Sequence, residues 1–365
     1  MTFTRIFHRG PARLRRRRTP IAVGLAGTML IAASVTGAAA EGSGPVRADG
    51  STSPGKTITA HYFAQVAPLD PPGSLGHITS LEGPAFGPDG DLYMVHSTAP
   101  ADQPKVIALD LRTREVRGIH KDPTALYASL QFSPADGKIY LTDLNGGIDR
   151  VNPDGTGYTT VVSGSVLGRQ LAPDDIAFDQ NGAMFVTDFQ GTPWEPTGRV
   201  IRFDPDGTHP TVLMDGLAGA NGISFDPEYS ALWVSEFRAG RVDHLPLSAD
   251  RTKPAGGYAV PSVGMYGNEG VGGFDSNAVD ADGNIYQCAF GDGKIYVYSP
   301  HGTLLATIVV PQTMPAPQLL TTNLVIKPGT HDGYLVVGGD NGGFVYTFRA
   351  LGLGDAQSNG GGTGA

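Results

Sequence analysis

Four oxygen-bearing side chains stand directly before short apolar runs at similar intervals along the chain. They are Glu82, Asp174, Asn221 and Asp275. If folding brings them together, the three carboxylates repel one another and their pKa values rise unless a cation neutralises them. The set holds no Cys or His, so its ligands are hard oxygens, which favours Ca²⁺ and leaves Mg²⁺ or Mn²⁺ open. The Ser276 hydroxyl, water or backbone carbonyls could complete the coordination shell.

Each of these residues also has an ordinary structural explanation. Asp and Asn beside Gly usually form turns, and Asn221-Gly222 is a common turn dipeptide. Taken singly, each of the four residues is better explained by a structural role than by metal binding. Their recurrence at one register favours ligands instead, because the turns of each repeat already lie elsewhere.

A hairpin pattern recurs six times and must position these residues. Each copy has an apolar pair, a polar turn and a second apolar run; the copies cover residues 85–95, 131–142, 177–187, 224–235, 278–288 and 325–337. The positions before the copies are roughly 45–54 residues apart, which is typical of four-stranded propeller blades. The sequence therefore predicts an all-β fold, a six-bladed β-propeller of four-stranded blades over residues 57–351. The early stretch 58–66 is expected to complete the last blade and close the ring.

The propeller explains why residues far apart in sequence could meet. The innermost strand of each blade lines the central channel, so the residues at its start converge at one mouth. Asp175, one residue after Asp174, is expected to point away and to fix the loop by hydrogen bonding. Asn323 occupies the sixth equivalent position and is a candidate substrate contact. Trp194, in a loop after the third copy, is another candidate, with packing on its own blade as the alternative.

The two ends of the chain differ from the middle. Residues 1–40 predict a signal peptide, with seven arginines, an apolar run over 21–33 that is too short to span a bilayer, and small residues at 38–40 for cleavage. Sec and Tat export both stay open, and an uncleaved membrane anchor is the alternative. Residues 41–56 predict a flexible linker and residues 352–365 a disordered tail.

Charge and cysteine content exclude some classes of function. Without the seven arginines of residues 1–40, 19 basic residues face 35 acidic ones, a formal charge of −16. Such a domain is a poor candidate for binding nucleic acid or, after signal cleavage, an anionic membrane. Its single cysteine, Cys288, permits no intramolecular disulfide and no Cys-based zinc site.

Four motifs resemble those of the regucalcin (senescence marker protein)/gluconolactonase family of six-bladed propellers. They are Leu81-Glu82-Gly83-Pro84, Asp174-Asp175-Ile176, Ala220-Asn221-Gly222-Ile223 and Phe274-Asp275-Ser276. Thr187-Asp188-Phe189, Leu232-Trp233-Val234 and Asn268-Glu269-Gly270 are similar to the drug-responsive lactonase branch. The similarity covers about residues 78–348.

This resemblance implies a metal-dependent lactonase, and the predicted signal peptide implies that it is secreted. Glu82, Asp174, Asn221, Asp275 and Ser276 would hold one divalent cation, usually Ca²⁺, and Asp275 would also transfer protons. The cation would polarise the lactone carbonyl and stabilise the developing oxyanion. The branch's second calcium site is not expected, because residues 145–147 and 166–171 lack the carboxylate and hydroxyls it needs.

The expected partner is a small lactone, and the expected state is a monomer. A non-catalytic extracellular scaffold with a structural cation is the alternative, because a propeller alone does not determine function. Another ester or phosphoester hydrolase using the same metal site is a third possibility.

Overall fold

The computed structural model describes residues 55–73, 76–256, 260–263, 272–311 and 319–356. The predicted signal peptide, residues 41–54 of the predicted linker and residues 357–365 of the predicted tail lie outside this part of the chain. So do Asn268, Glu269 and Gly270. Every regular element in the described residues is a β-strand. None of these residues forms a helix long and apolar enough to cross a membrane.

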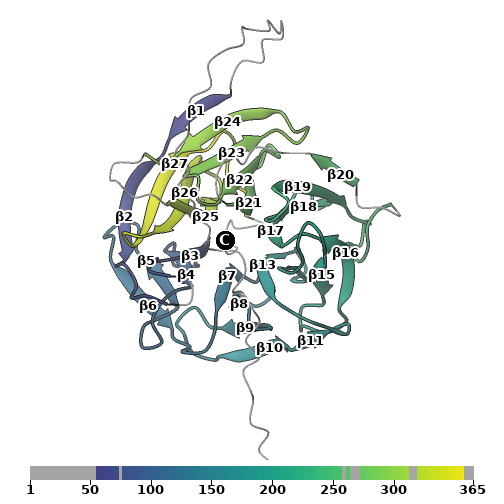
Figure 1. The fold of residues 1–365 in the computed structure, drawn as a ribbon, viewed down its shortest axis with the longest axis horizontal. Helices are drawn as coiled ribbons and strands as arrows, with labels where there is room; N and C mark the ends of the chain where they lie inside the picture. Colours follow the sequence, from purple (N-terminus) through teal and green to yellow (C-terminus); the bar gives the residue numbers. More distant parts are fainter. Residues whose placement is uncertain (1–54, 74–75, 257–259, 264–271, 312–318, 357–365) are drawn as a thin grey trace, which may run out of the picture. The chain divides into compact units, whose positions relative to one another are not determined.

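Six sheets surround a common centre and form a six-bladed β-propeller (Figure 1), as the sequence predicts. Blade one contains β3 (Leu81–Phe86), β4 (Leu92–His96), β5 (Val106–Leu109) and β6 (Val116–His120). Blade two contains β7 (Tyr127–Phe132), β8 (Ile139–Asp143), β9 (Gly147–Val151) and β10 (Thr159–Ser163). Blade three contains β13 (Pro173–Phe178), β14 (Met184–Asp188), β15 (Gly198–Phe203) and β16 (Thr211–Leu217). Blade four contains β17 (Ala220–Phe225), β18 (Ala231–Glu236), β19 (Arg241–Pro246) and β20 (Val260–Val263). Blade five contains β21 (Phe274–Val279), β22 (Ile285–Ala289), β23 (Lys294–Tyr298) and β24 (Leu304–Val309). Blade six contains β25 (Leu319–Ile326), β26 (Asp332–Gly339) and β27 (Gly343–Arg349). A short hairpin of β11 (Ser165–Val166) and β12 (Arg169–Gln170) joins blades two and three.

The innermost strands form a closed ring. They are β3, β7, β13, β17, β21 and β25, and each contacts the innermost strand of both neighbouring blades. All six begin at the same face of the ring, which we call the entry face. The second strand of each blade is antiparallel to the first and therefore ends at this face, as the pairing of Pro173 with Asp188 illustrates.

The ring is closed by two N-terminal strands rather than one. β2 (His61–Ala67) pairs antiparallel with β27 and completes blade six, as predicted. β1 (Lys56–Thr59) instead pairs in parallel with β24 and gives blade five a fifth strand. Ala60, between the two strands, is fully buried. The predicted single strand over 58–66 is thus divided between two blades.

The C-terminal segment is held on the face opposite the entry face. Residues 352–356, which the sequence assigns to the tail, are part of the described chain. Gly352 N donates to Asp280 Oδ2 at 2.9 Å, and Gly354 N donates to Thr330 O at 2.8 Å. These bonds connect the chain end to the first hairpins of blades five and six.

The core lies between adjacent blades. The sheet faces are apolar on both sides, so each blade packs on its two neighbours. Phe185 of β14 meets Phe225 of β17 edge to face, with ring centroids 4.9 Å apart, and both rings are fully buried. Burial of each such ring contributes about 2 kcal/mol. This packing holds the inner strands, and therefore the residues at their starts, in place.

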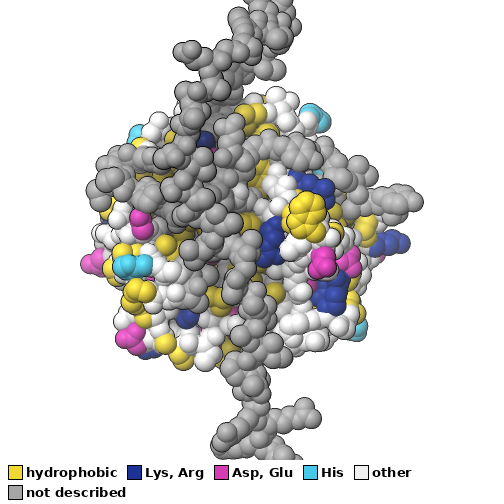
Figure 2. All heavy atoms as spheres, viewed as in Figure 1, with side chains coloured by type: hydrophobic (Ala, Val, Ile, Leu, Met, Phe, Trp, Pro, Cys, Tyr) yellow, Lys and Arg dark blue, Asp and Glu magenta, His cyan; other side chains and the backbone are white. Residues whose placement is uncertain are grey.

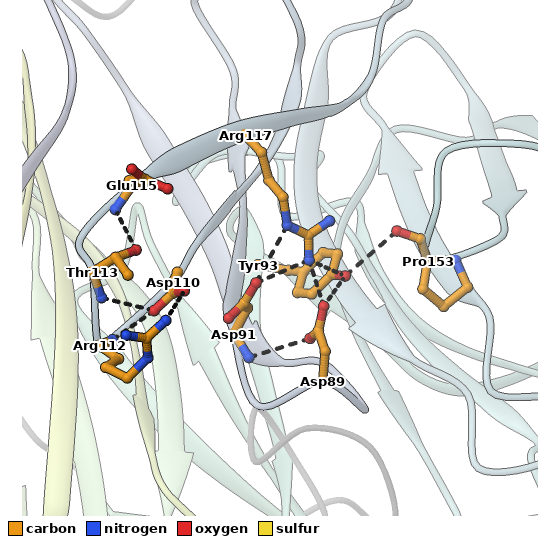
Figure 3. A network of polar contacts seen from close by, with 9 residues as sticks. All are labelled: Asp89, Asp91, Tyr93, Asp110, Arg112, Thr113, Glu115, Arg117 and Pro153. Atoms are coloured by element: carbon orange, nitrogen blue, oxygen red, sulfur yellow. Dashed lines mark hydrogen bonds and ion pairs between the residues drawn. The ribbon is translucent and has the colours of Figure 1, made fainter.

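Acidic residues on the opposite face serve the turns. In Figure 3, Asp110 accepts hydrogen bonds from Arg112 N at 2.7 Å and Thr113 N at 2.9 Å. Arg117 bonds to Asp91 at 3.0 Å and also contacts Asp89 and Tyr93. The acidic side chains that are visible in Figure 2 are scattered over the molecule. Much of the negative charge therefore belongs to ordinary turns.

Candidate active site at the entry face

An irregularity in strand pairing marks the start of all six innermost strands. The pairing with the second strand shifts between Glu82 and Ala85, Tyr127 and Ser129, Pro173 and Ile176, Ala220 and Ile223, Phe274 and Asn277, and Thr321 and Asn323. Such bulges re-aim side chains and are common beside active sites. The predicted metal ligands Glu82, Asp174, Asn221, Asp275 and Ser276, together with Asn323, lie within or next to these bulges. They are therefore part of the strands, whereas the sequence placed them just before the strands.

Two glycines let neighbouring inner strands approach closely at this level. A Cβ on Gly83, which has a φ of +50°, would lie 2.3 Å from Leu130 N in the next blade. A Cβ on Gly222 would lie 2.6 Å from Asn277 N. Real Cβ atoms cannot come so close to backbone. The glycine after Asn221 therefore serves packing between blades four and five within β17, and the turn explanation for Asn221-Gly222 is wrong.

Hydroxyl groups fasten the backbone of the site residues to the preceding blade. Thr187 Oγ1 donates to Asn221 O at 2.5 Å and accepts from Asp175 N at 2.9 Å. Ser235 Oγ donates to Asp275 O at 2.5 Å and accepts from Gly222 N at 2.7 Å.

The same arrangement is present between blades two and three, where Thr142 Oγ1 donates to Asp174 O. Thr142, Thr187 and Ser235 are therefore part of the site, although they are not among the residues predicted from the sequence. Their shared signal is a hydroxyl residue directly before an acid at the end of the second strand. Those acids cap backbone amides: Asp188, for example, accepts from Ala172 N at 2.9 Å.

The structure brings the predicted acidic residues into one electrostatic cluster. Burial raises the pKa of Glu82 well above its usual value, and the charges of Asp275, Asp174 and Asp175 raise it further. Glu82 keeps partial contact with solvent, although it lies deep among other residues. Burial and then Asp275 likewise raise the pKa of Asp174, while Arg238 opposes the shift.

Asp275 is held from several directions. Burial raises the pKa of its carboxyl well above the usual range, and hydrogen bonds from Ser276 N, at 3.0 Å, and from the Asn221 side chain oppose the rise. Its backbone carbonyl accepts from Gln287 Nε2 at 2.8 Å as well as from Ser235. The orientation of this carboxyl is therefore determined by blades four and five together.

Asp175 belongs to the cluster, although it was expected to point away. Its Oδ1 accepts from Ser129 Oγ at 2.6 Å and from Ile176 N at 2.9 Å, so it does hydrogen-bond as expected. Yet its charge also raises the pKa values of Glu82, Asp174 and Asp275. Burial raises its own pKa to about 6.

The chemistry of this donor set fits a hard cation. Asn221 Oδ1 is buried and has no hydrogen-bond partner in the described part of the chain. Leaving a buried amide oxygen unpaired is costly, and a cation would satisfy it. Asp174, Asp275 and Ser276 are also buried. Within the described residues, no three His, Cys, Asp or Glu side chains are already arranged as a metal site. A site here would therefore need the Asn221 and Ser276 oxygens as well as the carboxylates.

The two candidate substrate contacts differ in exposure. Trp194 lies in the loop between β14 and β15, on the entry face, and its side chain is 90% exposed. It therefore does not pack on its own blade. Asn323 is fully buried in β25, and its Oδ1 accepts from Leu324 N at 2.8 Å. Contact with substrate stays a prediction for both.

Comparison with known proteins agrees with this architecture. The profile of the SMP-30/gluconolactonase/LRE-like region matches residues 82–323. The chain belongs to this family. The matched segment begins at Glu82 and ends at Asn323, so it spans all six bulges. The family expected from the four motifs is confirmed.

Individual relatives support the same assignment. Lactonase drp35 of Staphylococcus saprophyticus is 31% identical over 249 residues, which are 64% of this chain and 75% of that protein. Among solved structures, a luciferin-regenerating enzyme has a TM-score of 0.65 at 16% identity, covering 84% of this chain and 99% of that one. The calcium-binding protein regucalcin of Agrobacterium tumefaciens has a TM-score of 0.59 at 18% identity, covering 82% and 98%. At these identities the solved structures show the shared fold alone.

Proposed function

We propose that this family member is a secreted lactonase that hydrolyses a lactone or related cyclic ester with the help of one divalent cation. The observation that carries the proposal is the mutual charge interaction of Glu82, Asp174 and Asp275, together with the buried, unpartnered Oδ1 of Asn221, whose side chain hydrogen-bonds Asp275. Buried carboxylates with raised pKa values that share one site are typical of functional sites. The drp35 relatives, named as lactonases, support the reaction class.

Five residues of this chain would hold the cation, most favourably Ca²⁺: Glu82, Asp174, Asn221, Asp275 and Ser276. Their carboxylate, amide and hydroxyl oxygens are the donors that Ca²⁺ prefers, and Mg²⁺ or Mn²⁺ would use the same types. When bound, the cation supplies Lewis-acid polarisation of the lactone carbonyl.

Asp275 is the proposed general base. Its carboxyl is oriented by Ser276 N and the Asn221 side chain, so it can take a proton from an attacking water at one defined position. It can then return the proton to the alkoxide that leaves when the ring opens. Asp175, tied to Ser129, contributes negative charge that favours cation binding rather than proton transfer.

A lactone screen with metal depletion tests this function. The purified protein would be assayed against aldono-, thio- and aromatic lactones with EDTA, and again after Ca²⁺ is restored. We expect hydrolysis that EDTA abolishes and Ca²⁺ recovers, and a loss of at least about 100-fold in Asp275→Ala. Asp110→Asn, in a turn on the opposite face, is the matched control and should keep full activity.

Three outcomes separate the alternatives. Activity that survives EDTA, or that is unchanged in Asp275→Ala, contradicts the mechanism. If EDTA lowers the melting temperature and no lactone is hydrolysed, the cation is structural and the protein is a binding scaffold. Export is tested separately by expressing the full chain and asking whether the protein is recovered outside the cells without its first 40 residues.

A further inference from the structure

Arg238 stands at the entry face between two very different surroundings. It lies in the loop directly after β18, and its backbone N donates to Ala218 O at 3.0 Å. On one side its charge acts on Asp174, one of the four carboxylates Glu82, Asp174, Asp175 and Asp275 that we call the acidic cluster. On the other side its guanidinium carbon lies 4.5 Å from the ring centre of Phe189.

An arc of aromatic rings supports this position. Phe189, Phe237 and Phe290 each follow directly after the second strand of their blade, so they lie at equivalent places on the entry face. Neighbouring rings meet edge to face, with centroids 5.7 and 5.5 Å apart. All three are half-buried. We call these three residues the aromatic arc.

The arc is built on fixed backbone. Phe189 N donates to Ala172 O at 2.8 Å, and Phe290 N donates to Gly273 O at 3.0 Å. A Cβ on Gly273 would lie 1.8 Å from Phe237 O, so only glycine fits there. The ring beneath Arg238 is therefore held in place, and cation–π attraction holds the guanidinium over it.

The guanidinium keeps donors for a ligand. Among the described residues, Gly191 O is the acceptor that it hydrogen-bonds, through Nη1. A guanidinium has five N–H donors, so most of them are not used inside the described structure. In the described part of the chain, Arg238 and Asp174 form no ion pair, although their charges interact. The guanidinium therefore acts on the Asp174 carboxylate from beyond ion-pair distance.

The positive charge of Arg238 repels a Ca²⁺ ion at the proposed site, so Arg238 does not help to hold that ion. Its position is explained if it serves an anion that binds next to the metal. We propose that Arg238, held by the aromatic arc, forms an anionic subsite that binds the carboxylate of a carboxylate-bearing lactone. The low polarity of the arc strengthens such a charge-assisted pair, and the planar guanidinium can hold both carboxylate oxygens. This inference rests on the proposed lactonase function.

Matched substrates test the subsite. The full-length protein would be assayed with 5-oxotetrahydrofuran-2-carboxylate and with its neutral methyl ester, which has the same lactone ring. We expect Arg238→Gln to raise KM for the carboxylate at least about tenfold, with kcat little changed and the ester little affected. Arg238→Lys should recover part of the loss, and Arg112→Gln, on the opposite face, should change neither substrate.

Other results would overturn the subsite or the proposed function. An equal loss on carboxylate and ester in Arg238→Gln, or no loss on either, overturns the subsite. If wild type hydrolyses neither of these compounds nor any lactone of the wider screen, the proposed function fails, and the subsite is then tested by calorimetric titration with succinate. Binding of succinate that Arg238→Gln abolishes would support an anion site without lactonase activity. No binding in wild type would reject the subsite as well.

Discussion

Ser235 Oγ lies 2.5 Å from the carbonyl oxygen of Asp275, so blade four holds the backbone of the proposed general base in blade five. The same hydroxyl accepts from Gly222 N at 2.7 Å and so also fixes the residue after Asn221. One side chain thus positions two site residues without itself being a proposed ligand.

Removing that hydroxyl is expected to impair the site without removing a ligand. Ser235→Ala leaves the buried Gly222 N–H unpaired and removes one of the two side-chain hydrogen bonds to Asp275 O, which costs about 1–3 kcal/mol of unfolding free energy. We expect kcat to fall about tenfold or more, because Asp275 loses its fixed orientation. Ser235→Thr should retain most activity. Ser230→Ala, at an exposed turn, is the control, and an Ala variant at Ser235 with unchanged kcat and melting temperature would contradict the positioning role.

Asn221 should control cation affinity through its unpartnered Oδ1. A ligand that binds only the folded protein raises stability by about 2.7 kcal/mol at one hundred times its Kd, so Ca²⁺ should raise the melting temperature of wild type. Asn221→Ala should shift that rise to higher Ca²⁺ concentrations. The measurement is a thermal-melt titration with CaCl₂ after EDTA treatment. Equal Ca²⁺ dependence in both proteins would remove Asn221 from the ligand set.

The acidic cluster predicts an unusual pH dependence for the metal-free protein. Burial raises the folded-state pKa values of Glu82, Asp174, Asp175 and Asp275, so the folded state binds more protons than the unfolded state. Stability from these groups is therefore greatest below the unfolded value and is lost as pH rises. For Asp175 the window runs from about 4, the ordinary Asp value, to about 6.

Melting curves at several pH values check this sign. In EDTA, the melting temperature should fall between about pH 4 and pH 6 and continue downward above it, because the other three shifts are also upward. In saturating Ca²⁺ the fall should be smaller or reversed, since the cation binds the deprotonated carboxylates. A metal-free melting temperature that rises steadily over this range would show that the carboxyls are not clustered in solution.

Gly222 should tolerate no side chain. Alanine there would place a Cβ 2.6 Å from Asn277 N and force blades four and five apart. We expect a loss of about 1–3 kcal/mol, together with reduced activity, because the contact supports Asn221 and Ser276. Gly256→Ala, where nothing lies within 4 Å of the added carbon, is the matched control. Unfolding curves in urea distinguish the two, and equal stability would contradict the packing argument.

The sequence by itself determined the number of blades and the kinds of atoms at the centre. Strand alternation and turn residues are local properties, so the six hairpins could be counted without coordinates. The recurrence of Glu82, Asp174, Asn221 and Asp275 at one register also identified a hard-oxygen donor set. These features depend only on residue type and spacing.

Tertiary structure decided which residues of neighbouring blades contact and position one another. The bulges place the site residues inside the strands, and Asp175 joins the cluster because Ser129 of the preceding blade holds it there. Thr187 and Ser235 matter through contacts with the next blade, and Arg238 through a ring in the preceding one. The division of the N-terminal stretch between blades five and six likewise depends on which outer edges are open. Local spacing carries none of this, because each contact joins residues that meet only when the ring is closed.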